Sequence, residues 1–150
     1  MSALTTDLDL KVPVIAAPMA GGASTPALVA AASRAGGLGF LAAGYKTPQA
    51  LSEQIDAVRA EGVSFGVNVF APNPVPVDVD AYRAYARAIQ VEADRYGITL
   101  ADGEPVEDDD YFADKIDLLL ASPVPVVSFT FGIPSLSSSM RCALPVRWSC

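Results

Sequence analysis

The chain has 150 residues, of which 51% are hydrophobic and 18% are charged, and its formal net charge is −7. This composition supplies enough apolar material for one core and excludes intrinsic disorder, which requires low hydrophobicity. The negative charge disfavours nucleic acid and anionic membranes as partners.

The most apolar stretch, residues 12–32, is interrupted by prolines and glycines. A membrane span needs about 20 predominantly apolar residues without such breaks, so no membrane-spanning segment is expected. Residues 1–10 lack the basic start and the apolar run of a secretory signal. We therefore expect a cytoplasmic protein.

The residue inventory limits the chemistry that the chain can perform. There is no histidine, which removes the commonest general base and metal ligand. The two cysteines, Cys142 and Cys150, lie late in the chain and do not make a disulfide framework. Acidic residues gather between positions 102 and 114 in an order that fits no EF-hand. We interpret this run as a solvated loop and helix start rather than a divalent-metal site.

Short apolar runs alternate with amphipathic segments from the beginning of the chain. Residues 12–17 are apolar and bounded by turn residues, as expected for a strand buried on both faces. A helix should follow, with Thr25 as its N-cap, Pro26 at its first position and Gly36 just past its end.

The same unit then repeats. Residues 38–43 are a second apolar run, and Thr47 with Pro48 again gives an N-cap and first-position pair. The predicted helix runs to about Glu61, and residues 64–70 form a third strand. Apolar residues at spacings of four and seven give this helix one face that can cover a sheet: Leu51, Ile55 and Val58.

The second half of the chain continues the alternation. Asp80 is expected to cap a longer helix that ends near Tyr96. A loop over residues 97–107, a helix over about residues 110–121 and a fourth strand over residues 124–131 should follow. One stripe of the longer helix is expected to pack in the core and at its rim: Tyr82, Tyr85, Ile89, Ala93 and Tyr96.

Strands and helices that alternate at this spacing predict an α/β fold with a parallel sheet and right-handed crossovers. Two architectures remain open, a small doubly wound sheet and a TIM-type barrel. Four strands can complete an open sheet, but they make only about half of a (β/α)₈ barrel, which typically needs about 250 residues.

The first strand ends in Ala-Ala-Pro-Met-Ala-Gly-Gly, at the end of the strand where ligands bind in either architecture. Pro18 restricts the backbone, whereas Gly21 and Gly22 permit the close approach of a flat ligand. The same glycines can also serve only as turn residues. The G-x-G-x-x-G fingerprint of dinucleotide-binding folds is absent from this turn.

Asn68 is the one polar side chain in residues 65–70 of the third strand. A buried amide without partners costs roughly 1–3 kcal/mol. Asn68 therefore either bonds to neighbouring backbone or points into the mouth of a barrel, toward a heteroaromatic ring or a phosphate. In the fourth strand, alternation places Ser128 and Thr130 on one face and Phe129 and Phe131 on the other.

Four segments of the chain resemble, in order, successive segments of the nitronate monooxygenases, formerly called 2-nitropropane dioxygenases. They are Pro-Val-Ile-Ala-Ala-Pro-Met-Ala-Gly-Gly, Ala-Gly-Gly-Leu-Gly-Phe-Leu-Ala-Ala-Gly-Tyr, Phe-Gly-Val-Asn-Val-Phe and Val-Val-Ser-Phe-Thr-Phe-Gly. Each segment falls on a predicted strand, and together they extend over residues 10–135.

The resemblance implies an FMN enzyme on a TIM-type barrel, with residues 1–135 as its N-terminal half and about four of the eight strands. It implies that Ala17, Pro18 and Met19 lie against the isoalloxazine ring. It also implies that Asn68 is hydrogen-bonded to the cofactor. Such enzymes oxidise alkyl nitronates with O₂ to a carbonyl compound and nitrite. We assign no catalytic residue, because a nitronate is already an anion and the cofactor supplies the redox chemistry.

Residues 136–150 differ in character, because they hold both cysteines, the only tryptophan and several serines without a helical period. We expect an aberrant or irregular tail, produced either by a shifted reading frame or as native sequence. The family's histidine and its glycine-rich phosphate-binding segments would lie further on. The chain as written should therefore bind FMN weakly and turn over little nitronate.

Two other functions remain open. The early segments also resemble FMN-dependent enoyl-thioester reductases of the same barrel type, which require a nicotinamide donor. The second alternative is a non-catalytic remnant or a small α/β binding module, which would show no flavin spectrum.

Overall fold

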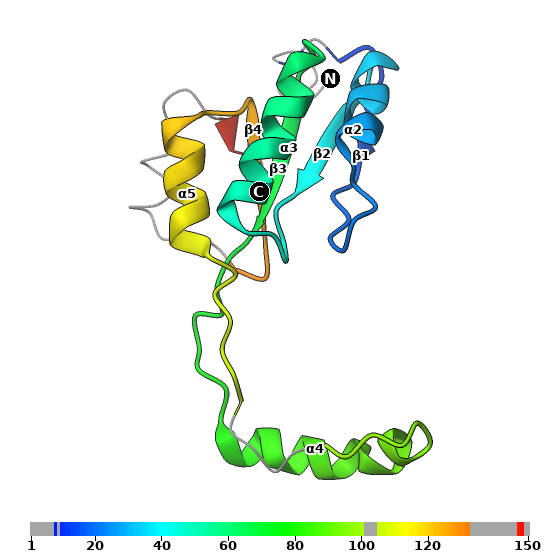
Figure 1. Ribbon diagram of the computed structural model, residues 1–150, viewed down its shortest axis with the longest axis vertical. Helices are drawn as coiled ribbons and strands as arrows, with labels where there is room; N and C mark the ends of the chain where they lie inside the picture. Colours follow the sequence, from blue (N-terminus) through cyan, green and yellow to red (C-terminus); the bar gives the residue numbers. More distant parts are fainter. Residues whose placement is uncertain (1–7, 9, 101–104, 133–146, 149–150) are drawn as a thin grey trace. The chain divides into compact units, whose positions relative to one another are not determined.

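The computed structural model describes residues 8, 10–100, 105–132 and 147–148. Five parallel strands form one sheet in the order β1-β2-β3-β4-β5 (Figure 1). The elements are β1 (Ile15–Ala16), α2 (Pro26–Arg34), β2 (Leu38–Ala42), α3 (Pro48–Ala60), β3 (Phe65–Phe70), α4 (Val79–Asp94), α5 (Phe112–Ala121), β4 (Val126–Thr130) and β5 (Arg147–Trp148). The parallel α/β fold predicted from the sequence is confirmed.

The chain divides into two compact units. One consists of residues 1–72 and 109–150 and contains the sheet with α2, α3 and α5. The other, residues 73–108, contains α4 and the segment that follows it. Each unit is described by itself below.

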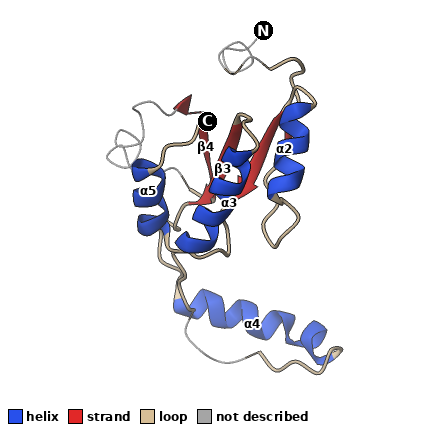
Figure 2. Cartoon of the chain, turned by 45° about the horizontal axis from the view of Figure 1, so that its top comes forward, coloured by secondary structure: helices blue, strands red, loops and turns tan. Residues whose placement is uncertain are grey.

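One face of the sheet is covered by α2, α3 and α5 (Figure 2). Alternate residues of β3 and β4 point into this face, where they meet the apolar face predicted for α3. The buried side chains of this core are Val29, Leu41, Ala43, Leu51, Ile55, Val58, Phe65, Val67, Val69, Leu119, Val124 and Val127. The three helices therefore pack on one face of the sheet only, and the side chains of the opposite face do not contribute to this core.

The opposite face of the sheet, called here the inner face, carries a different set of side chains. Leu38, Phe40 and Val126 form a second apolar cluster there, with Leu8 and Leu10 packed against it. This cluster lies at the N-terminal half of the strands. Nearer the C-terminal ends, the inner face becomes polar, beginning with Asn68.

The β1 strand is shorter than the predicted residues 12–17, and Pro18 provides the reason. The Leu38 N–H donates to the Val14 carbonyl at 3.0 Å, so the ladder between β1 and β2 uses alternate residues of each strand. Continued in this register, the donor to the Phe40 carbonyl would be the nitrogen of residue 18, and proline has no N–H. The strand pair therefore ends at Ala16.

The predicted N-caps of the first two helices are confirmed. Thr25 accepts a hydrogen bond from the Leu28 N–H at 3.2 Å, and Thr47 accepts one from the Ala50 N–H at 3.2 Å. In both helices a proline occupies the first position, where its missing N–H costs nothing.

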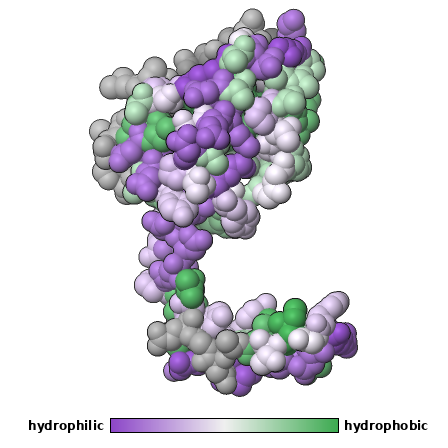
Figure 3. All heavy atoms as spheres, viewed as in Figure 1, coloured by the Kyte–Doolittle hydropathy of each residue, from purple (hydrophilic) through white to green (hydrophobic). Residues whose placement is uncertain are grey.

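The α4 unit differs from two predictions. Asp78, not Asp80, caps the helix, because its carboxylate accepts from the Ala81 N–H at 2.7 Å. The tyrosine stripe does not pack as predicted, since Tyr85 and Tyr96 are 63% and 79% exposed. Hydrophobic residues of this unit reach its surface, as the green spheres over α4 show (Figure 3). A helix with a short return segment has too little of its own surface to bury such a stripe.

The predicted tail, residues 136–150, lies outside the described residues except for β5. Arg147 and Trp148 pair in parallel with Val126 and Val127 of β4.

Replacing Thr47 with alanine tests the cap that begins α3. Thr47→Ala should lower the free energy of unfolding by about 1 kcal/mol, since one helical N–H loses its acceptor. The matched control is Ser52→Ala, which removes a hydroxyl from the interior of the same helix, where alanine is favoured. Urea unfolding monitored by circular dichroism measures both, and equal losses in the two variants would contradict the cap.

Candidate functional site

The C-terminal ends of β1 to β4 meet at one edge of the sheet, because all four strands are parallel. This edge holds all four residues that the sequence singled out for a cofactor. Ala17, Pro18 and Met19 follow β1, and Asn68 lies near the end of β3, two strands away. Among the described residues, no hydrogen bond joins the segment after β1 to Asn68. The segment after β1 and Asn68 therefore lie at the same edge but are not hydrogen-bonded to each other.

Ser24 shapes the segment after β1. Its side chain is buried, accepts from the Met19 N–H at 2.7 Å and donates to the Ala17 carbonyl at 3.4 Å. These contacts satisfy the backbone on both sides of Pro18 once the ladder has ended. Met19 remains 44% exposed at the rim.

The glycine pair after Met19 adopts backbone that other residues rarely use. Gly21 has φ 83° and Gly22 has φ 117°. A Cβ at either position would meet no atom within 4 Å, so the surroundings are open. Within this chain, the glycines are needed for the turn itself, and the backbone beside them is accessible to a flat molecule.

Asn68 is buried and bonds to the side chains of the neighbouring strand. Its amide nitrogen donates to the Ser128 hydroxyl at 2.9 Å and to the Thr130 hydroxyl at 3.1 Å. The Thr130 hydroxyl lies 3.3 Å from the Asn68 amide oxygen, to which it can donate. Asn68 pairs in register with Ser128, which places all three groups on the inner face. We call Asn68, Ser128 and Thr130 the amide cluster.

The amide cluster retains hydrogen-bonding capacity. The two hydrogens of the Asn68 amide are used by the two hydroxyls, and the Thr130 hydrogen can be used by the amide oxygen. One lone pair of that oxygen, one lone pair on each hydroxyl oxygen and the hydrogen of Ser128 remain. The cluster thus offers acceptors and one donor side by side, with no formal charge.

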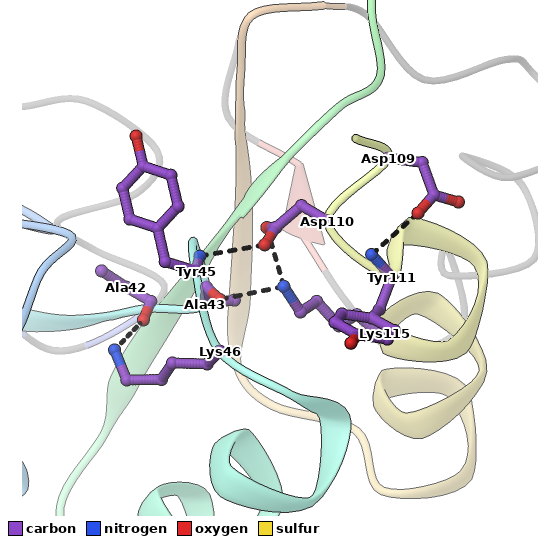
Figure 4. Close-up of polar contacts among 8 residues, drawn as sticks. All are labelled: Ala42, Ala43, Tyr45, Lys46, Asp109, Asp110, Tyr111 and Lys115. Carbon is purple, nitrogen blue, oxygen red and sulfur yellow. Dashed lines mark hydrogen bonds and ion pairs between the residues drawn. The ribbon is translucent and has the colours of Figure 1, made fainter. Parts of the chain in front are cut away.

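A buried ion pair lies at the same edge, next to the segment that follows β2 (Figure 4). Lys115 of α5 is fully buried, and its Nζ lies 2.7 Å from a carboxylate oxygen of Asp110 and donates to the Ala43 carbonyl at 3.0 Å. The other carboxylate oxygen accepts from the Tyr45 N–H at 2.9 Å. The prediction that the acidic run is solvated is wrong for Asp110, whose side chain is only 13% exposed.

The sequence contained one signal for this pair. Lys115 lies in the apolar stripe of the predicted helix, next to the buried Ile116 and four residues before the buried Leu119. A charge at such a position needs a partner, because burying an isolated ammonium is very costly. The partner, Asp110, precedes the helix by two residues, and no helical spacing identifies it.

Lys46 also lies at this edge. Its Nζ donates to the Ala42 carbonyl at 2.7 Å, which the shortened β1 leaves without a strand partner. Partial burial lowers the pKa of Lys46 below its usual value of 10.5, and the nearby charge of Lys115 lowers it further. The carboxylate of Asp110 acts in the opposite direction.

Two cavities lie away from the C-terminal edge. One, of about 260 Å³, opens near the N-terminal ends of the strands, between Leu10, Gly37 and Ser64. Another, of about 410 Å³, belongs to the α4 unit and is lined by Ala86, Gln90 and Leu100, among others. Neither includes a residue that the sequence assigned to a cofactor.

Within the described part of the chain, no helix is long and apolar enough to cross a membrane. No three histidine, cysteine or acidic side chains of that part gather closely enough to hold a metal ion.

A sequence profile for nitronate monooxygenase matches residues 2–142. The chain belongs to the nitronate monooxygenase family. Two Staphylococcus aureus proteins named probable nitronate monooxygenase, from strains MSSA476 and MRSA252, are 40% and 39% identical to it over 146 residues. Each alignment covers 92% of this chain and 39% of the relative. The chain thus spans about two fifths of the length of these family members.

Solved structures agree with the family. Nitroalkane oxidase from Streptomyces ansochromogenes is 44% identical, with a TM-score of 0.79 over 98% of this chain and 41% of that protein. FabK from Thermotoga maritima is 23% identical, with a TM-score of 0.63 over 97% of this chain and 35% of FabK, a likeness that shows the fold alone. Both neighbours are TIM-type barrels, and the parallel sheet of this chain is part of one.

The lowered pKa of Lys46 can be tested by competitive amine labelling. The neutral amine reacts, so the pH at which Lys46 is half-labelled should lie below 10.5, because burial favours the uncharged form. By linkage, the charged Lys46 ammonium lowers the free energy of unfolding at neutral pH. This loss is relieved as the pH rises through the lowered pKa of the folded protein.

Mass spectrometry of the labelled protein gives the extent of reaction at each lysine. The exposed Lys11 serves as an accessible reference, and the fully buried Lys115 should stay unlabelled while the protein is folded. Half-labelling of Lys46 at or above pH 10.5 would contradict the predicted direction.

Proposed function

We propose that the protein is an FMN-dependent oxidoreductase that oxidises alkyl nitronates with O₂ to a carbonyl compound and nitrite. The observation that carries the proposal is the uncharged amide cluster at the C-terminal edge of a parallel sheet, in a chain of the nitronate monooxygenase family. Ligands bind at this edge in parallel α/β barrels. In this proposal residues 1–135 form the N-terminal half of an FMN-binding barrel, residues 136–150 are an irregular tail apart from the two residues of β5, and the protein is cytoplasmic.

The donor set at this edge fits the flavin ring. The pyrimidine edge of an isoalloxazine presents an N–H between two carbonyl oxygens. The free lone pair of Asn68 can accept from such an N–H, and the Ser128 hydroxyl can donate to a neighbouring carbonyl. A neutral cluster suits a ring edge of this kind better than it suits a phosphate, which is bound by cations or helix N-termini.

The segment after β1 would supply the surface for the ring. Ala17, Pro18 and Met19 are small or apolar, and Ser24 holds the backbone of this segment in one conformation. A rigid apolar surface favours the stacking of a flat ring without ordering loose side chains on binding. Bound FMN would accept electrons from the nitronate and pass them to O₂.

The residues of this chain are not required to act as a base. A nitronate is already deprotonated at the reacting carbon, so binding and orientation are the tasks left to the protein. The absence of histidine from the whole sequence is compatible with such a role.

Oxygen consumption with an alkyl nitronate tests the reaction. The protein should consume O₂ and release nitrite when given the nitronate of 2-nitropropane and FMN, without a nicotinamide. An absolute requirement for NADH or NADPH would instead support the enoyl-thioester reductase alternative. If no flavin stays bound to the protein after saturation with FMN and removal of the free cofactor, a non-catalytic remnant would be supported.

The role of Asn68 can be tested by flavin affinity. Asn68→Leu keeps the approximate volume but removes the amide, and should raise the Kd for FMN about fivefold, since a lost hydrogen bond costs about 1 kcal/mol. Asn73→Leu is a matched control, because Asn73 is an exposed asparagine of the α4 unit. Fluorescence titration of FMN measures both, and equal affinity in the two variants would count against the proposed contact.

A further inference from the structure

Three aromatic rings meet at the C-terminal edge, each from a different strand end. The Phe70 ring centre lies 5.4 Å from that of Tyr45 and 4.8 Å from that of Phe131, and both contacts are edge-to-face. Tyr45 and Phe131 are 77% and 72% exposed. Gly44 makes the contact possible, because a Cβ there would lie 2.3 Å from the Phe70 ring. We call Tyr45, Phe70 and Phe131 the aromatic wall.

The two exposed members of the aromatic wall adopt strained backbone. Tyr45 has φ 64° and Phe131 has φ 72°, in the left-handed region that bulky residues rarely occupy. Strand alternation predicts that Phe131 lies with Phe129, away from the inner face, but the left-handed turn brings its ring against Phe70 instead. Strained residues that persist are concentrated at ligand-binding sites, because the surrounding structure must hold them there.

The buried ion pair supplies what holds Tyr45. Asp110 accepts from the Tyr45 N–H, and Lys115 binds both Asp110 and the Ala43 carbonyl, so the segment after β2 is attached at one point to α5 and at another to the residues just before it. Asp110 itself has a left-handed φ of 52°. Figure 4 shows the Tyr45 ring and the Lys46 side chain extending in different directions from this segment. The ion pair therefore directs the ring toward Phe70.

We propose that Tyr45 determines substrate specificity as part of the aromatic wall, and that Asp110 and Lys115 are its positioning residues. This inference rests on the proposed nitronate oxidation. Phe70 follows Asn68 by two residues on the same face of β3, and Phe131 directly follows Thr130. The wall thus adjoins the amide cluster, and the substituent of a nitronate beside the flavin would contact it.

The chemistry of the wall selects apolar substituents. Aromatic rings offer large apolar contact area, and their faces carry partial negative charge that disfavours an anionic group. The ammonium groups of Lys46 and Lys115 are engaged with the Ala42 carbonyl and with the Asp110 carboxylate, respectively. The protein should therefore prefer nitronates with alkyl or aryl substituents of several carbons over short ones and over ones that carry a carboxylate.

The test compares kcat/KM for the nitronates of 1-nitrohexane and nitroethane in the native flavin-loaded protein. Tyr45→Ala should reduce the preference for the longer substrate at least about tenfold, the low end of the discrimination given by one methylene in an apolar pocket. Tyr45→Phe should keep the preference, because the ring remains. Wild-type protein that oxidises neither substrate would overturn the proposed function. Active wild-type protein whose preference is unchanged in Tyr45→Ala would overturn only this inference.

The positioning role has a readout that does not depend on activity. In Lys115→Met, which keeps the length of the side chain and removes its charge, the Tyr45 amide should exchange its hydrogen at least tenfold faster, and the substrate preference should fall as in Tyr45→Ala. Asp110→Asn keeps an acceptor and tests the same point with less risk to folding. Glu92→Gln breaks an exposed ion pair with Arg95 and is the control. Folded variants of Lys115 and Asp110 that both keep wild-type exchange and preference would overturn the positioning role.

Discussion

The register of β3 between β2 and β4 is the constraint on which the rest of this structure depends. In this register Asn68 stands opposite Ala42 on one side and Ser128 on the other. Both faces of β3 are buried. A shift of the strand by one residue would therefore turn Asn68 into the helix-covered core and move Val67 and Val69 from that core to the inner face. An amide without partners in that core would cost roughly 1–3 kcal/mol, and the valines would no longer pack against the helices. The polar cluster and the apolar core therefore select the same pairing.

The Lys115–Asp110 pair adds a second constraint, which acts between elements rather than along the sheet. α5 begins without a side-chain cap, and the preceding Tyr111 has a left-handed φ of 54°. The start of this helix is stabilised instead by the contacts of Lys115 and Asp110 with the segment after β2. A buried ion pair is weak evidence for stability, because desolvation offsets much of the attraction. Its value here lies in fixing one arrangement of two segments that are far apart in the sequence.

These two constraints divide the C-terminal edge into parts with different chemistry. The segment after β1 supplies accessible backbone and small side chains, the amide cluster supplies neutral hydrogen bonds, and the aromatic wall supplies apolar surface. None of these parts offers a strong base among the described residues. Such an edge can hold and orient a ring and an anion that is already reactive, which is compatible with a family whose chemistry is supplied by a flavin.

The sequence by itself determined the order and type of the elements from β1 to β4, the caps at Thr25 and Thr47, the parallel α/β class and the family. Local signals are sufficient for these features, because capping, proline position and apolar periodicity act within a few residues. Only the tertiary structure decided the partners of Asn68, the burial of Asp110 and the meeting of Tyr45 with Phe70 and Phe131. Asn68 and Thr130 are 62 positions apart, and Tyr45 and Asp110 are 65 positions apart. Contacts at such separations follow from strand register and left-handed turns at bulky residues, neither of which leaves a periodic trace in the sequence.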